Sequence, residues 1–246
     1  MEERAEHRIR IRFAKYGVMK FTGHLDLMHF FQQLIRRSDI PINYSAGLSP
    51  HQIMSFALPL STGLTSRGEY LDIETGYLIP SEKAVRMMNE HSVEGIDILS
   101  YKVLPQKARN AMASVKAADY TVRFRDGYLP PAGFAGRFDE LMGLEELTVL
   151  KKTKKSEKII NIRPLIHEYY TETADGDDNT QIPVIKLKLS TGSVDNLKPE
   201  LVIQAVYEHE GMKLPEHALL INRDEMYTLS DDGLFVSLDE TGKNIE

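Results

Sequence analysis

The chain contains neither cysteine nor tryptophan. Without cysteine it can form no disulfide, and it cannot itself hold a cysteine-ligated zinc ion or iron–sulfur cluster. It also has no apolar run approaching the roughly 20 residues that a membrane-spanning helix requires. The first ten residues, MEERAEHRIR, are charged and lack the apolar core of a secretory signal. We therefore expect a cytoplasmic protein that does not contact a membrane.

The familiar motifs of several enzyme classes are missing as well. There is no GxxxxGK[ST] loop for a nucleotide phosphate, no GxGxxG after a strand, no HExxH and no GxSxG. The eight histidines are scattered rather than paired at metal-ligand spacing. The sequence thus predicts no cofactor and no metal site, and it does not reveal a reaction.

What remains is ordinary for a globular chain, except for the distribution of charge. The 246 residues are 42% hydrophobic and 27% charged, enough for one large domain or two small ones. The net charge is −6, yet residues 8–58 hold seven basic residues against two acidic ones, and residues 151–163 hold six against one. Two basic blocks on an acidic background can present a positive face to a polyanion, although solvated surface lysines and arginines explain them equally.

Hydrophobic periodicity predicts alternating strands and helices in the first half. Arg8–Ala14 alternates isoleucine and phenylalanine with arginine, as a half-buried strand does. His24–Arg37 carries apolar residues at helical spacing, with Asp26 near its start and Arg36 and Arg37 at its end. The remaining predicted elements are the strands Gln52–Leu58, Glu69–Glu74 and Gly95–Leu104 and the helix Ser81–His91.

The second half repeats this order of elements without repeating the sequence. The predicted strands are Asp119–Arg125, Pro183–Leu189 and Ala218–Leu229, the helices are Phe134–Gly143 and Pro199–Glu210, and Leu147–Lys151 with Ile159–Ile166 form a hairpin. Glu168–Gln181 is acidic and polar and is predicted to be an exposed loop. The order β-α-β-β-α-β in each half predicts an α+β protein of two tandem ferredoxin-like domains. Their expected bounds are residues 8–110 and 117–230, followed by a frayed tail at 231–246.

Two connections in the first half concentrate residues that can do chemistry. Gly23, His24 and Asp26 mark a helix start, where an exposed histidine can act as an acid, a base or an anion contact. The segment Tyr44–His51 is a loop in which Gly47 permits a tight turn and Pro50 sets an extended exit. It can direct Ser45, Ser49 and His51 at a ligand. A core-edge histidine and an ordinary loop remain equally good interpretations.

The basic residues form the candidate nucleic-acid surface. They are Arg10, Arg12, Lys20, Arg36 and Arg37 in the first half and Lys151, Lys152, Lys154 and Lys155 in the predicted hairpin. Arginine pairs with phosphate through two parallel hydrogen bonds, and lysine adds charge that makes binding salt-dependent. Helix-dipole stabilisation alone also explains Arg36 and Arg37.

The stretch from Arg8 to Glu74 resembles the radical-SAM-linked (radical-SAM-associated) domain family of uncharacterised function. The matching positions are Lys15, Gly17, Lys20, Phe21, Gly23, His24, Leu25, Asp26, Arg36, Arg37, Tyr44, Ser45, Gly47, Pro50, His51, Ser55, Phe56, Ala57, Pro59, Leu60, Gly63, Ser66, Glu69 and Tyr70. The chain departs from the pattern at Leu48, where phenylalanine is usual, and at Gln52, where proline is common. The resemblance implies a companion of radical-SAM proteins, often encoded near ribonuclease E/G and ribosomal-protein genes. A radical-SAM cluster must come from that partner, since this chain has no cysteine.

Three functions follow as expectations. The first is an RNA-binding accessory protein that acts with a radical-SAM partner in tRNA or rRNA modification or processing. The second is a metal-independent RNA-processing enzyme of the CRISPR repeat-processing type, with His24 and His51 as acid and base and Tyr44 or Lys20 in support, an analogy that rests on fold alone. The third is a module that docks the radical-SAM protein, with the acidic segment Glu168–Gln181 suited to a basic partner. Ser55 and Glu69 are expected to shape the site.

Overall fold

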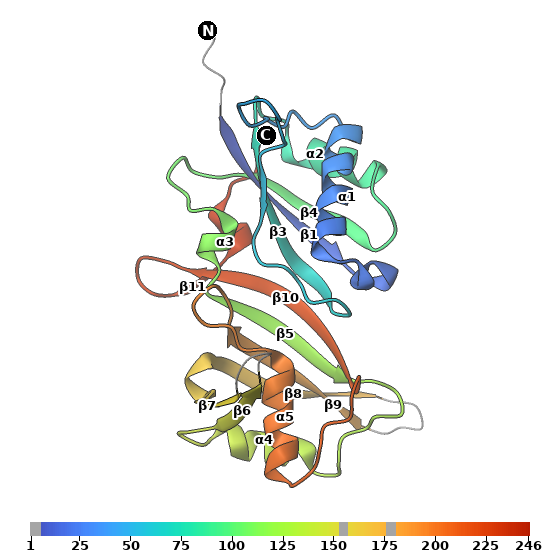
Figure 1. Ribbon diagram of the computed structural model, residues 1–246, viewed down its shortest axis with the longest axis vertical. Coiled ribbons are helices and arrows are strands. Elements are labelled where there is room, and N and C mark those ends of the chain that lie inside the picture. The colour runs from blue at the N-terminus through green and yellow to red at the C-terminus, as the bar shows by residue number, and fades with distance from the viewer. Residues whose placement is uncertain (1–5, 153–156, 176–180) are drawn as a thin grey trace. The chain divides into compact units, whose positions relative to one another are not determined.

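The protein is described here by a computed structural model covering residues 6–152, 157–175 and 181–246 (Figure 1). Helices and strands combine in an α+β fold, as predicted. The chain divides into two compact units: unit 1 comprises residues 1–116 and 223–246, and unit 2 comprises residues 117–222. The polypeptide therefore passes from one unit to the other before β5 (Ala117–Phe124) and again within β10 (Leu219–Leu229).

Unit 1 begins with a β-α-β-β-α-β order of elements. These are β1 (His7–Lys15), η1 (Gly17–Phe21), α1 (His24–Arg37), β2 (Met54–Phe56), β3 (Thr65–Thr75), α2 (Ser81–Glu90), β4 (Ile96–Val103) and the short α3 (Ala111–Ser114). β1 pairs antiparallel with β4 and β3, and β2 pairs antiparallel with β3. β1 and β2 align with the same residues of β3, Leu71 and Ile73, so they occupy opposite edges of that strand. The sheet order is therefore β4-β1-β3-β2 along this part.

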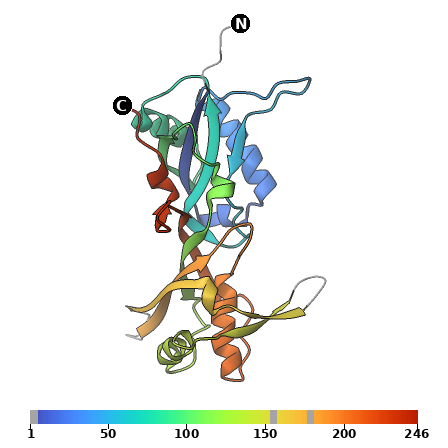
Figure 2. The same cartoon turned by 90° about the vertical axis from the view of Figure 1, so that its left-hand side faces the viewer.

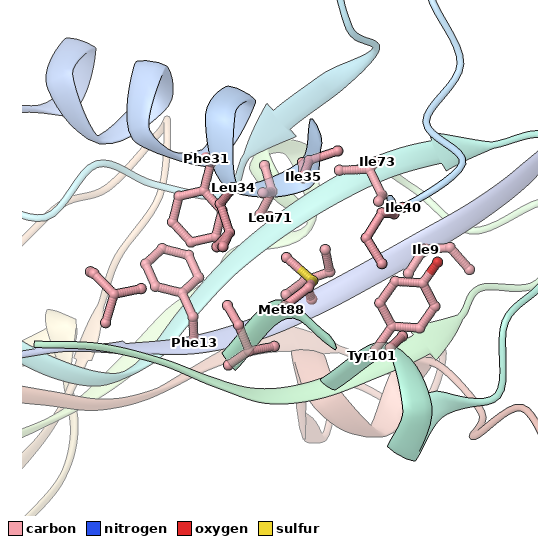
Figure 3. Close-up of a cluster of buried hydrophobic side chains, with 14 of the residues drawn as sticks. Ile9, Phe13, Phe31, Leu34, Ile35, Ile40, Leu71, Ile73, Met88 and Tyr101 are labelled. Carbon is pink, nitrogen blue, oxygen red and sulfur yellow. The ribbon is translucent and has the colours of Figure 1, made fainter. Parts of the chain in front are cut away.

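The core of unit 1 lies between this sheet and the helices α1 and α2. Ile9 and Phe13 project from one face of β1, and Phe31 and Leu34 project from α1 toward them (Figure 3). The rings of Phe13 and Phe31 lie 4.6 Å apart. Each large side chain buried in this way contributes about 1.5–3 kcal/mol relative to its exposed state. The alternation that predicted β1 and the apolar stripe that predicted α1 both face this core.

The C-terminal segment is ordered, so the predicted frayed tail is wrong. β11 (Phe235–Ser237) pairs with β10, and η4 (Leu238–Thr241) follows it. Leu238 is fully buried, and Ile245 packs against the core of unit 1. β11 and η4, drawn in red, lie across the sheet from α1 (Figure 2). The segment is mostly polar, which led to the prediction of a frayed tail. The buried Leu238 and several backbone hydrogen bonds attach it to the rest of unit 1.

In unit 2 the strands β5, β9 and β8 pair antiparallel in that order. The elements of this unit are β5 (Ala117–Phe124), α4 (Phe134–Met142), β6 (Thr148–Lys152), β7 (Glu157–Asn161), η2 (Arg163–Leu165), β8 (Ile166–Asp175), β9 (Gln181–Ser190) and α5 (Pro199–His209). β6 and β7 form the predicted hairpin as a separate two-stranded sheet. Phe134 of α4 contacts Phe124 of β5 and Tyr207 of α5, which closes an aromatic core over the sheet.

The predicted exposed loop at Glu168–Gln181 is wrong over its first half. Residues 168–175 belong to β8, whose register runs from Glu168 opposite Lys188 to Asp175 opposite Gln181. The segment reads as a loop because it is hydrophilic. Tyrosine and threonine nevertheless fit a strand, and an edge strand needs only one half-buried face. Tyr169 supplies that face by packing against Phe138.

Candidate nucleic-acid interface

A buried lysine holds the turn that precedes α1. Lys15, at the end of β1, is 1% exposed, and its amine donates a hydrogen bond of 2.8 Å to the carbonyl of Thr22. Burial lowers the pKa of Lys15, the negative charge of Glu69 opposes that effect, and the positive charge of Arg223 adds to it. The turn carries Gly23, which precedes α1 with an ordinary extended backbone. Space does not require a glycine there, because an added Cβ would be 3.6 Å from its nearest neighbour, the Asp26 carboxylate.

Glu69 shapes the site from inside the protein. It is buried and accepts two hydrogen bonds from Arg223 of β10, at 2.8 and 2.7 Å. Arg223 also donates to the carbonyl of Leu58 at 2.8 Å, while its own carbonyl accepts from the Ser66 hydroxyl at 2.8 Å. Gly68 lies so close to β10 that an added Cβ would be 2.6 Å from the carbonyl oxygen of Asp224. Residues far apart in the sequence thus fix the strand β3 and the segment after β2.

Arg10 is not a surface cation, and its assignment to the nucleic-acid surface is wrong. It is 2% exposed and makes two parallel hydrogen bonds to Asp72, at 2.8 and 2.9 Å. It also donates to the Thr241 hydroxyl at 2.7 Å. The polar face of β1, which the alternation placed in solvent, is covered by the C-terminal segment. Arg10 therefore binds that segment to the sheet.

Arg12 is partly exposed, and its charge is compensated. Its guanidinium lies 3.0 Å from the carboxylate of Glu225 and donates to the carbonyl of Arg67 at 3.0 Å. Burial raises the pKa of Glu225, and burial together with the adjacent Glu225 raises the pKa of Tyr70, whose hydroxyl donates to that carboxylate. Arg12 is thus a weaker candidate for phosphate contact than the sequence indicated.

The exposed side of α1 keeps the other predicted residues. Phe21, just before the helix, is 65% exposed, and the Lys20 amine lies 5.1 Å from the centre of its ring. His24 is exposed and packs edge-on against Phe56, with ring centres 5.4 Å apart. Asp26 and the helix-terminal Arg36 and Arg37 are also exposed. In the part of the chain that the structure describes, the guanidinium of Arg37 bonds only Gln33, and no carboxylate pairs with either arginine.

The loop Tyr44–Gln52 closes on itself. Tyr44 and Gln52 form an isolated antiparallel bridge, and the Ser45 amide donates to the carbonyl of His51 at 2.8 Å. The Ser45 hydroxyl is 2.8 Å from Nδ1 of His51 and accepts from the His51 amide at 3.1 Å. Gly47 has φ of +113°, a conformation that favours glycine. The closed base leaves Leu48, Ser49 and Pro50 exposed at the tip.

The structure does not bring His24 and His51 together. Gln52, the neighbour of His51, donates to the carbonyl of Gln32 at 3.2 Å. Gln32 is eight residues beyond His24, which corresponds to about 12 Å along a helix. Direct proton transfer between groups needs hydrogen-bond distances of about 3 Å. Ser55, on β2 opposite Asp72, is half-buried between these two regions.

The lysine-rich hairpin is only partly visible. Lys151 and Lys152 belong to β6, and the backbone register places Lys151 opposite Lys158. Lys154 and Lys155 lie outside the described residues.

No three histidine, aspartate or glutamate side chains gather as metal ligands within residues 6–152, 157–175 and 181–246. None of the helices described is long and apolar enough to cross a membrane.

The sequence analysis did not identify the buried charged residues that support the candidate site. Asp72, Arg223 and Glu225 had no predicted role. Asp72 alone carried a usable signal, because it lies between Leu71 and Ile73 and a charge on a buried strand requires a partner, whereas Arg223 and Glu225 belong to a run of three charged residues. The partners are 62 and 154 residues apart along the chain, so spacing could not identify them.

Comparison with known proteins identifies a family. Residues 8–199 match the model of the family described as "Uncharacterized protein conserved in bacteria (DUF2344)", and the chain belongs to that family. No curated protein matches it. Among solved structures, the chain is similar to one titled "Crystal Structure of an Unknown Protein from Galdieria sulphuraria", at 10% identity and a TM-score of 0.26, over 89% of this chain and 98% of that one.

Proposed function

We propose that this member of the family is an RNA-binding accessory protein whose RNA lies along the exposed side of α1. The observation that carries the proposal is the pairing of an exposed ring, Phe21, just before α1, with the exposed arginines at the far end of α1. Single-stranded nucleic acid is bound by this combination, in which bases stack on aromatic rings and phosphates pair with basic groups. The loop that contains Tyr44 adds a second exposed ring in the same unit.

The fold supports the proposal at a finer level. We propose that both units are ferredoxin-like. In unit 1 the element order and the strand order β4-β1-β3-β2 support this. In unit 2 the order β5, α4, β8, β9, α5, β10 supports it once the hairpin β6–β7 is treated as an insertion. Sheets of this kind are a common frame for RNA recognition, although fold alone never establishes function.

The resemblance supplies the rest of the proposal. We propose that the protein acts beside a radical-SAM protein on tRNA or rRNA. The iron–sulfur cluster would belong to that partner, because this chain has no cysteine with which to hold it. The geometry gives the enzymatic alternative no support, because His24 and His51 sit at different levels of α1.

Replacing Arg36 and Arg37 together with alanine should weaken RNA binding and reduce its salt dependence. Each phosphate contact that is lost lowers the slope of log K against log salt by about 0.7 for single strands. The measurement is the binding of total cellular RNA across a salt series. Lys83→Ala/Arg86→Ala is the matched control, because it removes two exposed charges from α2 in the same unit. Unchanged slopes in Arg36→Ala/Arg37→Ala, or equal losses in both variants, would reject the proposal.

One observation favours the docking of a protein instead. Val18 and Leu25 are 76% and 65% exposed beside Phe21, and apolar residues gathered in this way often mark a protein contact. If the radical-SAM protein docks here, Val18→Ser/Leu25→Ser should abolish its co-purification and leave RNA affinity within about twofold. Co-purification that survives high salt and nuclease in the native chain would favour docking, whereas its loss after nuclease treatment would indicate bridging by RNA.

A further inference from the structure

β8 is an open edge of the sheet in unit 2. It follows β9 at the end of the strand order and extends over ten residues, Ile166–Asp175. One edge of it pairs with β9 along nearly its whole length, and no described strand pairs with the other. In Figure 2, β8 is the yellow-orange strand that forms the margin of this unit. Such an edge presents a row of backbone N–H and C=O groups that can take another strand.

Much of the usual protection against pairing is absent along this edge. Proteins block open edges with charged side chains, above all lysine, and with proline, short strands or bulges, and the charges of β8 are acidic, which opposes an acidic partner but not a basic one. β8 contains no lysine and no proline, and its one irregularity lies at its start, between Ile166 and Glu168. Tyrosine and threonine, which favour strands, occupy four of its positions, Tyr169, Tyr170, Thr171 and Thr173. The strand is thus chemically suited to accept a partner.

The side chains on the strand indicate the charge of that partner. Tyr170 is 54% exposed, and Glu172, on the same face two residues further, is exposed as well. β8 holds three acidic residues, Glu168, Glu172 and Asp175, and no lysine or arginine. Among the residues that the structure describes, Glu168 forms an ion pair with Lys188 at 2.7 Å, and Glu172 and Asp175 form none. A second copy of β8 would bring like charges together, so self-pairing is disfavoured.

We propose that β8 binds an extended, lysine- or arginine-bearing segment of another protein as an added strand. Backbone hydrogen bonds supply affinity in this mode of recognition, and alternate side chains supply specificity. Glu172 faces the basic side chains, and the exposed ring of Tyr170 covers their aliphatic stems. This site lies in unit 2 and does not depend on the RNA-binding face of α1.

The test uses the full chain and the fluorescently labelled peptide (Thr-Lys)5. Fluorescence anisotropy should show binding, and hydrogen exchange of the β8 amides should slow in the complex. The same peptide N-methylated at alternate residues keeps its charge and loses half of its hydrogen-bond donors, so it should bind at least tenfold more weakly. Glu172→Lys should weaken the binding of (Thr-Lys)5 about five- to tenfold. Glu216→Lys, an exposed change elsewhere in unit 2, should have no effect.

Several results would overturn the inference. Absence of binding would do so, as would equal affinity for the methylated peptide, which would show attraction of charge without strand addition. Equal binding of (Thr-Glu)5 would remove the role of charge. Concentration-dependent dimers of the native chain that Glu172→Lys alters would assign the edge to a second copy.

Discussion

Replacing Arg10 with methionine is expected to lower the free energy of unfolding by about 3–5 kcal/mol, the usual cost of removing one partner of a buried ion pair. Methionine keeps much of the side-chain volume, but it leaves the Asp72 carboxylate, which is buried and also accepts from the Ala111 amide, without its bidentate donor. The C-terminal segment loses a further bond at Thr241. The loss should therefore be visible both in global stability and in the protection of residues 235–245.

Urea unfolding measures the first effect and hydrogen exchange the second. A cycle with Asp72→Asn and the double variant should show coupling between the two sites, because residues in one network do not contribute additively. RNA binding by the folded variant should match that of the native chain, since Arg10 is not at the surface. A cost below about 1 kcal/mol, or RNA affinity that falls while stability holds, would return Arg10 to the nucleic-acid interface.

The contrast between Arg10 and Phe13 shows what a sequence pattern can establish. Alternation along β1 places Ile9, Ile11 and Phe13 on one face, and the structure confirms a core there. The same alternation states only that the arginines share the other face. What covers that face is a segment more than 200 residues away, and no local pattern encodes it. Helix α1, whose stripe and ends are local properties, was by contrast predicted at its exact bounds.

The prediction of a loop in place of β8 was wrong for a related reason. The strand's residues from Glu168 to Asp175 are mostly polar and carry no apolar alternation, so nothing local distinguishes an exposed strand from a loop. Pairing with β9 decides the matter, and that pairing is a tertiary event. The site follows the same rule: the loop Tyr44–His51 and the basic end of α1 were found from turn chemistry and charge. The separation of His24 from His51 depends on where Gln52 meets the helix.

Replacing Arg223 with methionine is the second change expected to cost about 3–5 kcal/mol at pH 7. Glu69 would then remain buried with only the distant charge of Lys15 to balance it, and the carbonyl of Leu58 would lose its donor. An unpaired buried carboxylate is relieved when it takes up a proton, so the destabilisation should shrink as the pH falls toward about 4. Urea unfolding of the native chain and the variant at pH 7 and pH 4 tests both statements. Arg86→Met, on exposed α2, should change stability by less than about 0.5 kcal/mol at either pH.

If the loss in Arg223→Met is equal at the two pH values, the ion pair is not its source, and lost packing against β3 and the segment after β2 explains it instead. The expected pH dependence has a consequence for binding as well. Arg223, paired with Glu69, bonds the segment after β2, and Lys15 bonds the turn before α1. The buried network therefore supports the start of α1, where His24 lies, and the segment that follows β2. The variant should therefore bind RNA more weakly at pH 7 than Arg86→Met does, although none of the three buried side chains reaches the surface. A folded Arg223→Met variant with native affinity would show that the network supports stability alone.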